Sequence, residues 1–193
     1  MAPQLSPEQI VEGLANASPL EERRLRADLL RIGEAAVPAL IRAVESQESS
    51  KCTYAADILT AINPQAAFHT LITALNSANL NLRQKAIDLL GDIGNQDAVP
   101  ILIDHLRQER PFLQIYVIQS LGKLKDKRAV DSLIPLLQSD VPSSLRYTTV
   151  EALGLIGDKK ALPMIRALRD DPDHHVRSRV EIALKSLGET PQI

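Results

Sequence analysis

The stretch LRQKAIDLLGDIGNQDAVPILIDHL at residues 82–106 decides the fold, because LRYTTVEALGLIGDKKALPMIRAL at residues 145–168 repeats its pattern. In both stretches an arginine follows the first leucine, a G-x-I-G turn ends the first apolar run, and A-x-P opens a second run. Self-similarity of this length is the mark of stacked supersecondary units, each of which buries its apolar face only against its neighbours. The sequence therefore predicts a protein built from stacked repeats.

A leucine-isoleucine pair marks the second run of each repeat. The pairs are Leu40-Ile41, Leu71-Ile72, Leu102-Ile103, Leu133-Ile134 and Met164-Ile165, at a constant step of 31 residues. Another aliphatic residue follows four positions after the first member every time. An i, i+1, i+4 pattern is the buried stripe of a helix, here called helix B.

A second apolar series with i, i+3 spacing lies between those helices and predicts helix A of each repeat. Its members are Leu29/Ile32, Leu59/Ile62, Leu90/Ile93, Leu121/Leu124, Leu153/Ile156 and Leu184/Leu187. Turn formers follow most of them, and we expect left-handed residues there: Gly33, Asn63, Gly94, Gly157 and Gly188, with Lys125 breaking the series.

The sequence thus predicts an all-α protein, an α-solenoid of two-helix repeats in one domain spanning residues 1–193. We expect a capping helix, five A–B hairpins and a closing helix, about 12 helices in all. The predicted spans are 6–16, 19–32, 36–46, 50–62, 65–76, 80–93, 97–108, 111–124, 128–138, 142–156, 160–169 and 173–187.

These repeats resemble a known family. The arginine that opens helix A, the A-L-G-x-I-G-D that ends it and the A-V-P that opens helix B look like the HEAT-like repeat of the phycobilisome lyase type. The resemblance covers roughly residues 19–188. It implies the solenoid fold and, as one function, work on phycobiliproteins and their bilins.

The composition limits the function. A formal charge of −2 and a pI near 6.1 argue against a nucleic-acid binder, which normally carries a basic stripe. The N-terminal sequence lacks the basic and apolar blocks of a signal peptide, and no apolar run approaches membrane-spanning length. One cysteine, Cys52, allows no intramolecular disulfide and favours a reducing compartment. We expect a cytoplasmic protein without membrane insertion.

Two columns of helix B change from repeat to repeat and are our candidate partner-binding residues. In solenoids of this kind the B helices line the concave surface, where mixed charges can recognise one protein surface. The first column is Arg42, Thr73, Asp104, Pro135 and Arg166, and the second is Glu45, Asn76, Arg107, Gln138 and Arg169. An ordinary solvated face would show the same mixture, so both interpretations stay open.

A third column lies ten residues before the last apolar residue of each helix A. It holds Glu22, Cys52, Arg83, Gln114, Arg146 and Arg177. Asp140 and Asp171 precede the last two arginines by six residues. We expect an Asp–Arg ladder that ties each helix B to the next helix A, in preference to an anion-binding role for these arginines.

No catalytic pattern is visible. The phosphate-binding, dinucleotide-binding and nucleophile-elbow motifs are absent, and the iron-dependent deoxyhypusine hydroxylases, also built from HEAT-like repeats, need repeated His-Glu pairs that this sequence lacks. Adjacent His174 and His175 cannot easily share one metal ion, so we expect no metal site, and we expect Cys52 to be a small apolar residue at the core edge.

Two functions remain. The first is a non-enzymatic scaffold, adaptor or chaperone that binds a protein partner and needs no cofactor. The second, implied by the resemblance, is a phycobilin lyase subunit or a phycobilisome maturation or degradation factor. Such a protein would hold a bilin and a phycobiliprotein, and it would work mostly by positioning them.

Overall fold

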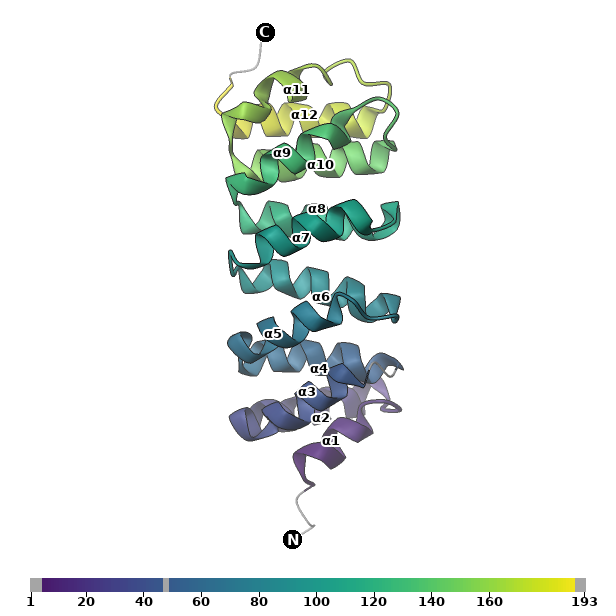
Figure 1. The fold of residues 1–193 in the computed structure, drawn as a ribbon. Coiled ribbons are helices and arrows are strands. Elements are labelled where there is room, and N and C mark those ends of the chain that lie inside the picture. The colour runs from purple at the N-terminus through teal and green to yellow at the C-terminus, as the bar shows by residue number, and fades with distance from the viewer. Residues whose placement is uncertain (1–4, 47–48, 190–193) are drawn as a thin grey trace. The chain divides into compact units, whose positions relative to one another are not determined.

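The structure is a computed structural model that describes residues 5–46 and 49–189, with the side chains of residues 49–50 left aside. Over these residues it is all-helical, an α-solenoid, and contains no strand (Figure 1). The chain divides into two compact units, residues 1–93 and 94–193, and each is described by itself. The single domain over 1–193 stays a prediction.

The first unit contains three A-type and three B-type helices. The A layer consists of α2 (Pro19–Ile32), α4 (Ser49–Ile62) and α6 (Leu80–Ile93), in which each helix contacts the next. The B layer consists of α1 (Pro7–Gly13), α3 (Val37–Glu45) and α5 (Pro64–Ala74), which are also in contact in series. A 3-10 turn, η1 (Gly33–Ala36), leads from α2 into α3.

The second unit continues the same alternation. Its A layer is α8 (Pro111–Leu124), α10 (Ser143–Ile156) and α12 (His174–Ser186), with α10 packed between the other two. Its B elements are α7 (Ala98–Gln108), then η2 (Lys127–Ala129), α9 (Val130–Leu133) and η3 (Ile134–Leu137), and last η4 (Lys159–Ala161) with α11 (Leu162–Arg166). Helix α11 contacts both η3 and α12.

Helix ends follow from local chemistry. Ser6 and Ser18 each form a capping box at the start of α1 and α2, which satisfies backbone N–H groups that no turn of helix can pair. Helix α10 ends at Gly157, whose φ of 76° is the left-handed conformation that costs glycine little. Lys125 also adopts a left-handed φ of 54°, so the position keeps its conformation without glycine.

The left-handed residue predicted at Asn63 is wrong. Its φ is −142°, and its side-chain oxygen accepts a hydrogen bond from the backbone N–H of Ala66 at 2.8 Å. Asparagine here caps the start of α5 rather than ending α4, which is the stronger local preference of a short polar side chain.

A helix is found at each predicted span, and α2, α6 and α8 match their predicted spans at both ends. The fourth helix B, predicted over 128–138, is instead α9 followed by the tighter η3. Pro135 lies in η3 and has no N–H to donate to a residue four positions back, so a regular α-helix cannot run through it. The fifth helix B, predicted over 160–169, ends at Arg166.

A column of buried alanines shows the true repeat step. Ala36, Ala67, Ala98, Ala129 and Ala161 are all fully buried at the start of the B segments. Four residues after each of them stands another fully buried residue: Leu40, Leu71, Leu102, Leu133 and Ile165. Each such side chain stabilises the fold by about 1.5–3 kcal/mol through burial.

The constant 31-residue step is therefore wrong at the fifth repeat. Met164, which the sequence pattern aligned with Leu133, is 42% exposed, and Ile165 takes the buried place. The extra residue lies between Ala129 and Ala161, in line with the longer step between Leu121 and Leu153 in the A helices. As a consequence, every residue of the fifth helix B shifts by one position relative to its predicted column.

Close packing of the A helices depends on two glycines. A Cβ atom on Gly122 would lie 3.0 Å from the Cα of Ala152, and one on Gly154 would lie 3.1 Å from the Cα of Ala183. Helices α8, α10 and α12 therefore approach each other backbone to backbone, which only a residue without a side chain permits.

Candidate functional site

The two candidate columns of helix B lie on the solvent side of the B helices. Seven of the nine candidate residues keep their predicted positions and are exposed: Arg42, Thr73, Asp104, Glu45, Asn76, Arg107 and Gln138. Pro135, also in the first column, is exposed as well. We call these positions, within each unit, the B-helix face.

Arg166 and Arg169 do not belong to those columns, because of the one-residue shift. Counted from Ile165, the residues that continue the two columns are Ala167 and Asp170, and both are exposed. Arg166 occupies the place of the half-buried Ile134, and Arg169 the place of the buried Leu137. The fifth helix B therefore carries two guanidinium groups where the fourth carries aliphatic side chains.

Several charges on the B-helix face are paired within the chain. Arg42 contacts Glu8 of α1 at 2.8 Å, and both side chains are more than half exposed. Arg107 contacts Asp104 one turn earlier on α7 at 3.3 Å, with both side chains 67% exposed. Solvent screens exposed pairs of this kind, so they contribute little to stability and these groups can exchange partners at little cost.

Arg166, the last residue of α11, and Arg169, which follows the helix, contact the same carboxylate. The Nε of Arg166 donates to the two carboxylate oxygens of Glu189 at 3.1 and 3.0 Å, and a terminal nitrogen of Arg169 lies 3.3 Å from one of them. Glu189 follows the last helix α12 and its side chain is only 17% exposed. Arg169 also lies 3.6 Å from Glu181 of α12.

The predicted Asp–Arg ladder is wrong in its pairing. Arg146 binds Asp171, not Asp140: its Nε and one terminal nitrogen each donate to a different Asp171 oxygen at 2.9 Å. Both side chains are buried, while Asp140 is exposed. The pair joins the start of α10 to the segment that leads into α12, two successive A helices, so the carboxylate comes from one repeat later than predicted.

Three further members of this column bond to backbone carbonyls. Arg83 donates to the carbonyl of Ser77 at 3.1 Å, Gln114 to that of Leu106 at 2.9 Å, and Arg177 to that of Asp171 at 2.6 Å. These acceptors lie in the last turn of a helix B or in the segment after it, where carbonyls lack helical partners. The column therefore holds each B segment against the next helix A, and the anion-binding alternative has no support from these contacts.

Cys52 occupies the same column and is fully buried, as expected of a small apolar residue. Burial raises the pKa of its thiol above the ordinary value, which works against a thiolate nucleophile. The amide of Asn79 lies 3.7 Å from its sulfur. At this joint, Cys52 and the buried Ser77 stand where Arg146 and Asp171 stand in the second unit.

Sequence reasoning missed a cluster of possible metal ligands at the start of α12. One ligand atom each from Asp173, His174 and His175 can be chosen so that all three lie within 4.8 Å of one another, so adjacency alone does not exclude a shared ion. However, the Asp173 carboxylate accepts the backbone N–H of His175 at 2.8 Å as the helix cap. The adjacent rings, with centroids 3.8 Å apart, are exposed. The position of Asp173 as the N-cap of α12 explains why these three residues lie close together.

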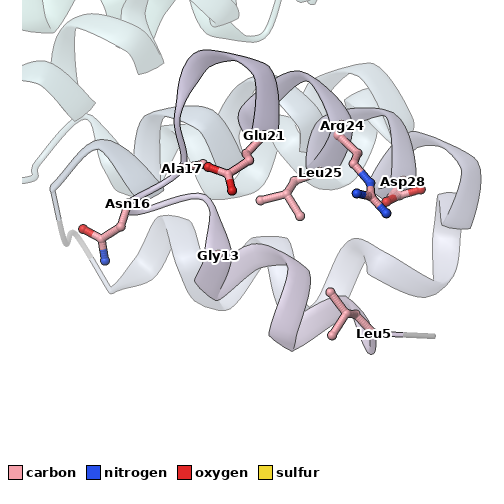
Figure 2. Close-up of a pocket in the computed structure, with 8 residues that line it drawn as sticks. All are labelled: Leu5, Gly13, Asn16, Ala17, Glu21, Arg24, Leu25 and Asp28. Atoms are coloured by element: carbon pink, nitrogen blue, oxygen red, sulfur yellow. The ribbon is translucent and has the colours of Figure 1, made fainter. Parts of the chain in front are cut away.

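A groove between α1 and α2 was also not predicted. It has a volume of about 370 Å³, and Figure 2 shows Leu25 of α2 pointing into it, with Leu5 at its far edge. Glu21, Arg24 and Asp28 line it along α2. The lining of the groove mixes apolar residues with charged residues of both signs. This mixture does not indicate a particular ligand.

Across the described residues, none of the helices combines the length and hydrophobicity needed to cross a lipid bilayer.

HEAT repeats are recognised at residues 37–113 and again at 106–185, which together cover most of the chain. The chain belongs to the HEAT-repeat family. No match was found among the curated proteins.

Solved structures place this HEAT-repeat chain among helical solenoids. The complex of CpcE and CpcF of phycocyanin lyase from Nostoc sp. PCC7120 is 27% identical with a TM-score of 0.61, and the match covers 97% of this chain and 66% of that one. Human deoxyhypusine hydroxylase is 21% identical with a TM-score of 0.55, over 94% of this chain and 84% of that one. A designed armadillo repeat protein is 16% identical with a TM-score of 0.59, over 95% of this chain and 100% of that one. The last two show the fold alone.

Proposed function

We propose that this HEAT-repeat chain is a non-enzymatic scaffold, adaptor or chaperone that binds a protein partner on its B-helix face. One observation carries the proposal. The B helices keep their buried positions uniform, with Leu40, Leu71, Leu102 and Leu133 all fully buried, while the exposed columns beside them change charge and size at every repeat. Packing explains the first set and leaves the second available for recognition.

The chemistry of the face favours a protein over a nucleic acid. Arg42 and Glu45 place both signs of charge on one turn of α3, and Asp104 and Arg107 do the same on α7, while the whole chain has a formal charge of −2. A phosphate backbone would be repelled by half of these groups, whereas a folded protein surface presents both signs and can match them.

Substitutions on the face of one helix test the proposal. Thr73→Arg, in the last turn of α5, and Asn76→Arg, two residues after its end, change two exposed positions and are called here the α5 variants. Gln119→Arg is the matched control, because Gln119 is an exposed residue of the A helix α8. The stability of all three variants should stay within about 0.5 kcal/mol of wild type, since surface changes rarely cost more.

The measurement is capture of partners from native lysate, compared variant by variant. We expect a protein captured by the wild type to be lost with both α5 variants and retained with Gln119→Arg. Retention by the α5 variants together with loss by the control would place the binding surface on the A helices and contradict the proposal.

The similarity to the phycocyanin lyase complex favours a second candidate. At 27% identity over 97% of this chain, it supports a phycobilin lyase subunit, or a maturation or degradation factor, that holds a bilin and a phycobiliprotein. Such a protein acts by positioning its two substrates, which requires little chemistry of its own.

Co-expression with a bilin distinguishes the two candidates. A coloured purified protein, or transfer of the bilin to a phycobiliprotein subunit, would favour the lyase-like function. A colourless protein that still captures one partner in a manner sensitive to Thr73→Arg would favour the scaffold.

A further inference from the structure

The end of the second unit departs from the repeat in its charge. Arg166 and Arg169 lie one turn apart on and just after α11, at the places held in the preceding hairpin by Ile134 and Leu137. Aliphatic side chains there serve packing between B segments. Two guanidinium groups instead form a planar, multi-donor surface suited to carboxylates.

A carboxylate already occupies this surface. Glu189 accepts from Arg166 with both oxygens, at 3.1 and 3.0 Å, and from Arg169 at 3.3 Å. The Arg166 side chain remains 50% exposed, so part of its guanidinium group still faces solvent. The contact shows that the two arginines converge closely enough to hold one carboxylate together.

The backbone after α12 directs Glu189 to the arginines. Gly188 has a φ of 87°, and the N–H of Glu189 donates to the carbonyl of Leu184 at 2.9 Å. This is the reversed turn that commonly ends a helix, and it sends the chain back toward α11. The acid therefore reaches the arginines from a turn, not from the interior of a helix.

The equivalent acids in earlier repeats do different work. Asp126 and Asp158 follow α8 and α10, and each accepts the backbone N–H two residues ahead, at 2.8 and 2.9 Å. They cap the segment that follows them. Glu189, one methylene longer, is paired with the preceding B segment instead.

We propose that Arg166 and Arg169 form a docking site for an acidic segment of a protein partner, with Glu189 as the resident occupant that the partner's carboxylate displaces. The inference rests on the proposed scaffold function and specifies its partner chemistry. Charge complementarity selects the occupant: the site presents two cations, and the carboxylate it already holds is a side chain of the same kind.

The exchange needs no rearrangement of the fold. Rotation of the Glu189 side chain frees the guanidinium group of Arg166 and leaves Arg169 only its 3.6 Å contact with Glu181. The turn at Gly188 and the hydrogen bond from the N–H of Glu189 to Leu184 remain in place. The gain on exchange comes from a partner that offers several carboxylates, since Arg107 of the same unit carries only an exposed pair, with Asp104.

A fluorescein-labelled peptide of six glutamates is the probe, with a six-glutamine peptide as the uncharged control. Fluorescence anisotropy at low salt measures its binding to the full chain. We expect Glu189→Gln to tighten binding about tenfold, because the internal competitor loses its charge. Adding Arg166→Gln to Glu189→Gln should abolish this gain, whereas adding Arg110→Gln, at an exposed arginine just before the A helix α8, should leave most of it.

Several results would overturn the inference. Equal binding by wild type and Glu189→Gln would mean that Glu189 does not compete for the site. Equal loss with Arg110→Gln and Arg166→Gln would indicate general charge attraction, and a labelled oligonucleotide that binds as tightly as the peptide would indicate a phosphate site. If no variant bound the peptide, the contact of Arg166 and Arg169 with Glu189 would serve only to hold the segment after α12 against the B segment before it.

The peptide experiment and the lysate capture test the docking site and the scaffold proposal separately. If lysate capture depends on Thr73 and Asn76 while the glutamate peptide fails to bind, the scaffold stands and the acidic docking site falls. If the peptide binds through Arg166 while capture is retained by the α5 variants and lost with Gln119→Arg, the docking site stands and the scaffold proposal falls.

Discussion

The fourth and fifth B segments occupy the same structural role in one unit and differ in what they expose. The fourth presents Ile134 half-buried and Leu137 buried, whereas the fifth presents Arg166 and Arg169 at those places. Both keep the fully buried pair at the start of the segment, Ala129 with Leu133 and Ala161 with Ile165. The repeat therefore needs only its first buried turn, and the second turn is free to change from packing to charge.

The comparison also separates two kinds of charged contact. Arg146 and Asp171 are buried at the joint between successive A helices, and they hold the repeats together. Arg166 and Glu189 are partly exposed at the edge. A buried pair is costly to break because it leaves an unpaired charge, while an exposed pair costs little. The predictions below follow that order.

The largest effect is expected at the buried joint. Asp171→Ala leaves the guanidinium group of Arg146 without a carboxylate, although the carbonyls of Ser139 and Val141 still accept from it. We expect a loss of about 3–5 kcal/mol in the free energy of unfolding, measured by chemical denaturation. The double variant Arg146→Gln with Asp171→Ser should lose less, since it introduces a neutral pair like Cys52 and Ser77 at the equivalent joint. A double variant as unstable as Asp171→Ala would contradict this account.

Acidification should act on the same joint. Burial opposes ionisation of Asp171, but hydrogen bonds from Arg146 and from the N–H of Asp173 outweigh it and hold the pKa of Asp171 below its ordinary value. A carboxyl group whose pKa is lower in the folded state adds stability at neutral pH, and this is lost as the pH falls below about 4. Thermal melts from pH 7 to pH 3 should show a smaller decline for Asp171→Asn than for wild type. Parallel declines would show that other carboxylates dominate.

The corrected repeat step predicts unequal effects at two adjacent residues. Ile165→Ala should cost about 2–5 kcal/mol, because it removes a fully buried side chain. Met164→Ala should stay within about 0.5–1 kcal/mol, because Met164 is 42% exposed. Urea denaturation of both variants decides the step. The reverse order would restore the constant 31-residue spacing.

A smaller loss of stability is expected from a substitution where the helices α10 and α12 pack closely. Gly154→Ala places a methyl group 3.0 Å from the Cβ of Ala183, which forces α10 and α12 apart at a cost of about 1–3 kcal/mol. Alanine also favours the helix by up to about 1 kcal/mol relative to glycine, so the net loss should be near 1 kcal/mol. Thermal denaturation of Gly154→Ala with Ala183→Gly should show partial recovery. If the two substitutions were additively destabilising, the close approach of α10 and α12 would not be the cause of the loss in Gly154→Ala.

The smallest effect is expected at the edge. Glu189→Gln should change the free energy of unfolding by less than about 1 kcal/mol, since its partner Arg166 is half exposed. A larger loss in urea denaturation would mean that the pair holds the end of the solenoid together and is not available for exchange.

Much of the fold could be predicted from the sequence because periodic burial and helix ends are local properties. The spans of α2, α6 and α8 follow from apolar spacing and the residues beside it. The step failed at Met164-Ile165 because this pair imitates the Leu-Ile pairs in hydrophobicity. The small residue Ala161 would have placed the step correctly, since a buried alanine tolerates no larger substitute.

The candidate site was harder to predict because its contacts are not local. The expected ladder paired Arg146 with an aspartate six residues earlier, but the acid that binds it lies 25 residues later. The contact of Arg166 with Glu189 spans 23 residues and depends on a turn direction set by Gly188. Spacing within one repeat carries no information on such contacts, whereas it does predict that Thr73 and Asn76 are exposed.

The column of buried alanines also governs how such a chain can lengthen. A duplication of residues 98–128 would start at one buried alanine, Ala98, and stop just before the next, Ala129, so it would insert one whole hairpin and leave every later residue in phase. A duplication of the same length that began at Ala129 would end one residue short of Ala161 and rotate all that follows by about 100° around its helix axis. The alanines thus mark the positions at which this sequence can be cut and joined, and a change in the number of repeats is tolerated only in whole steps between them.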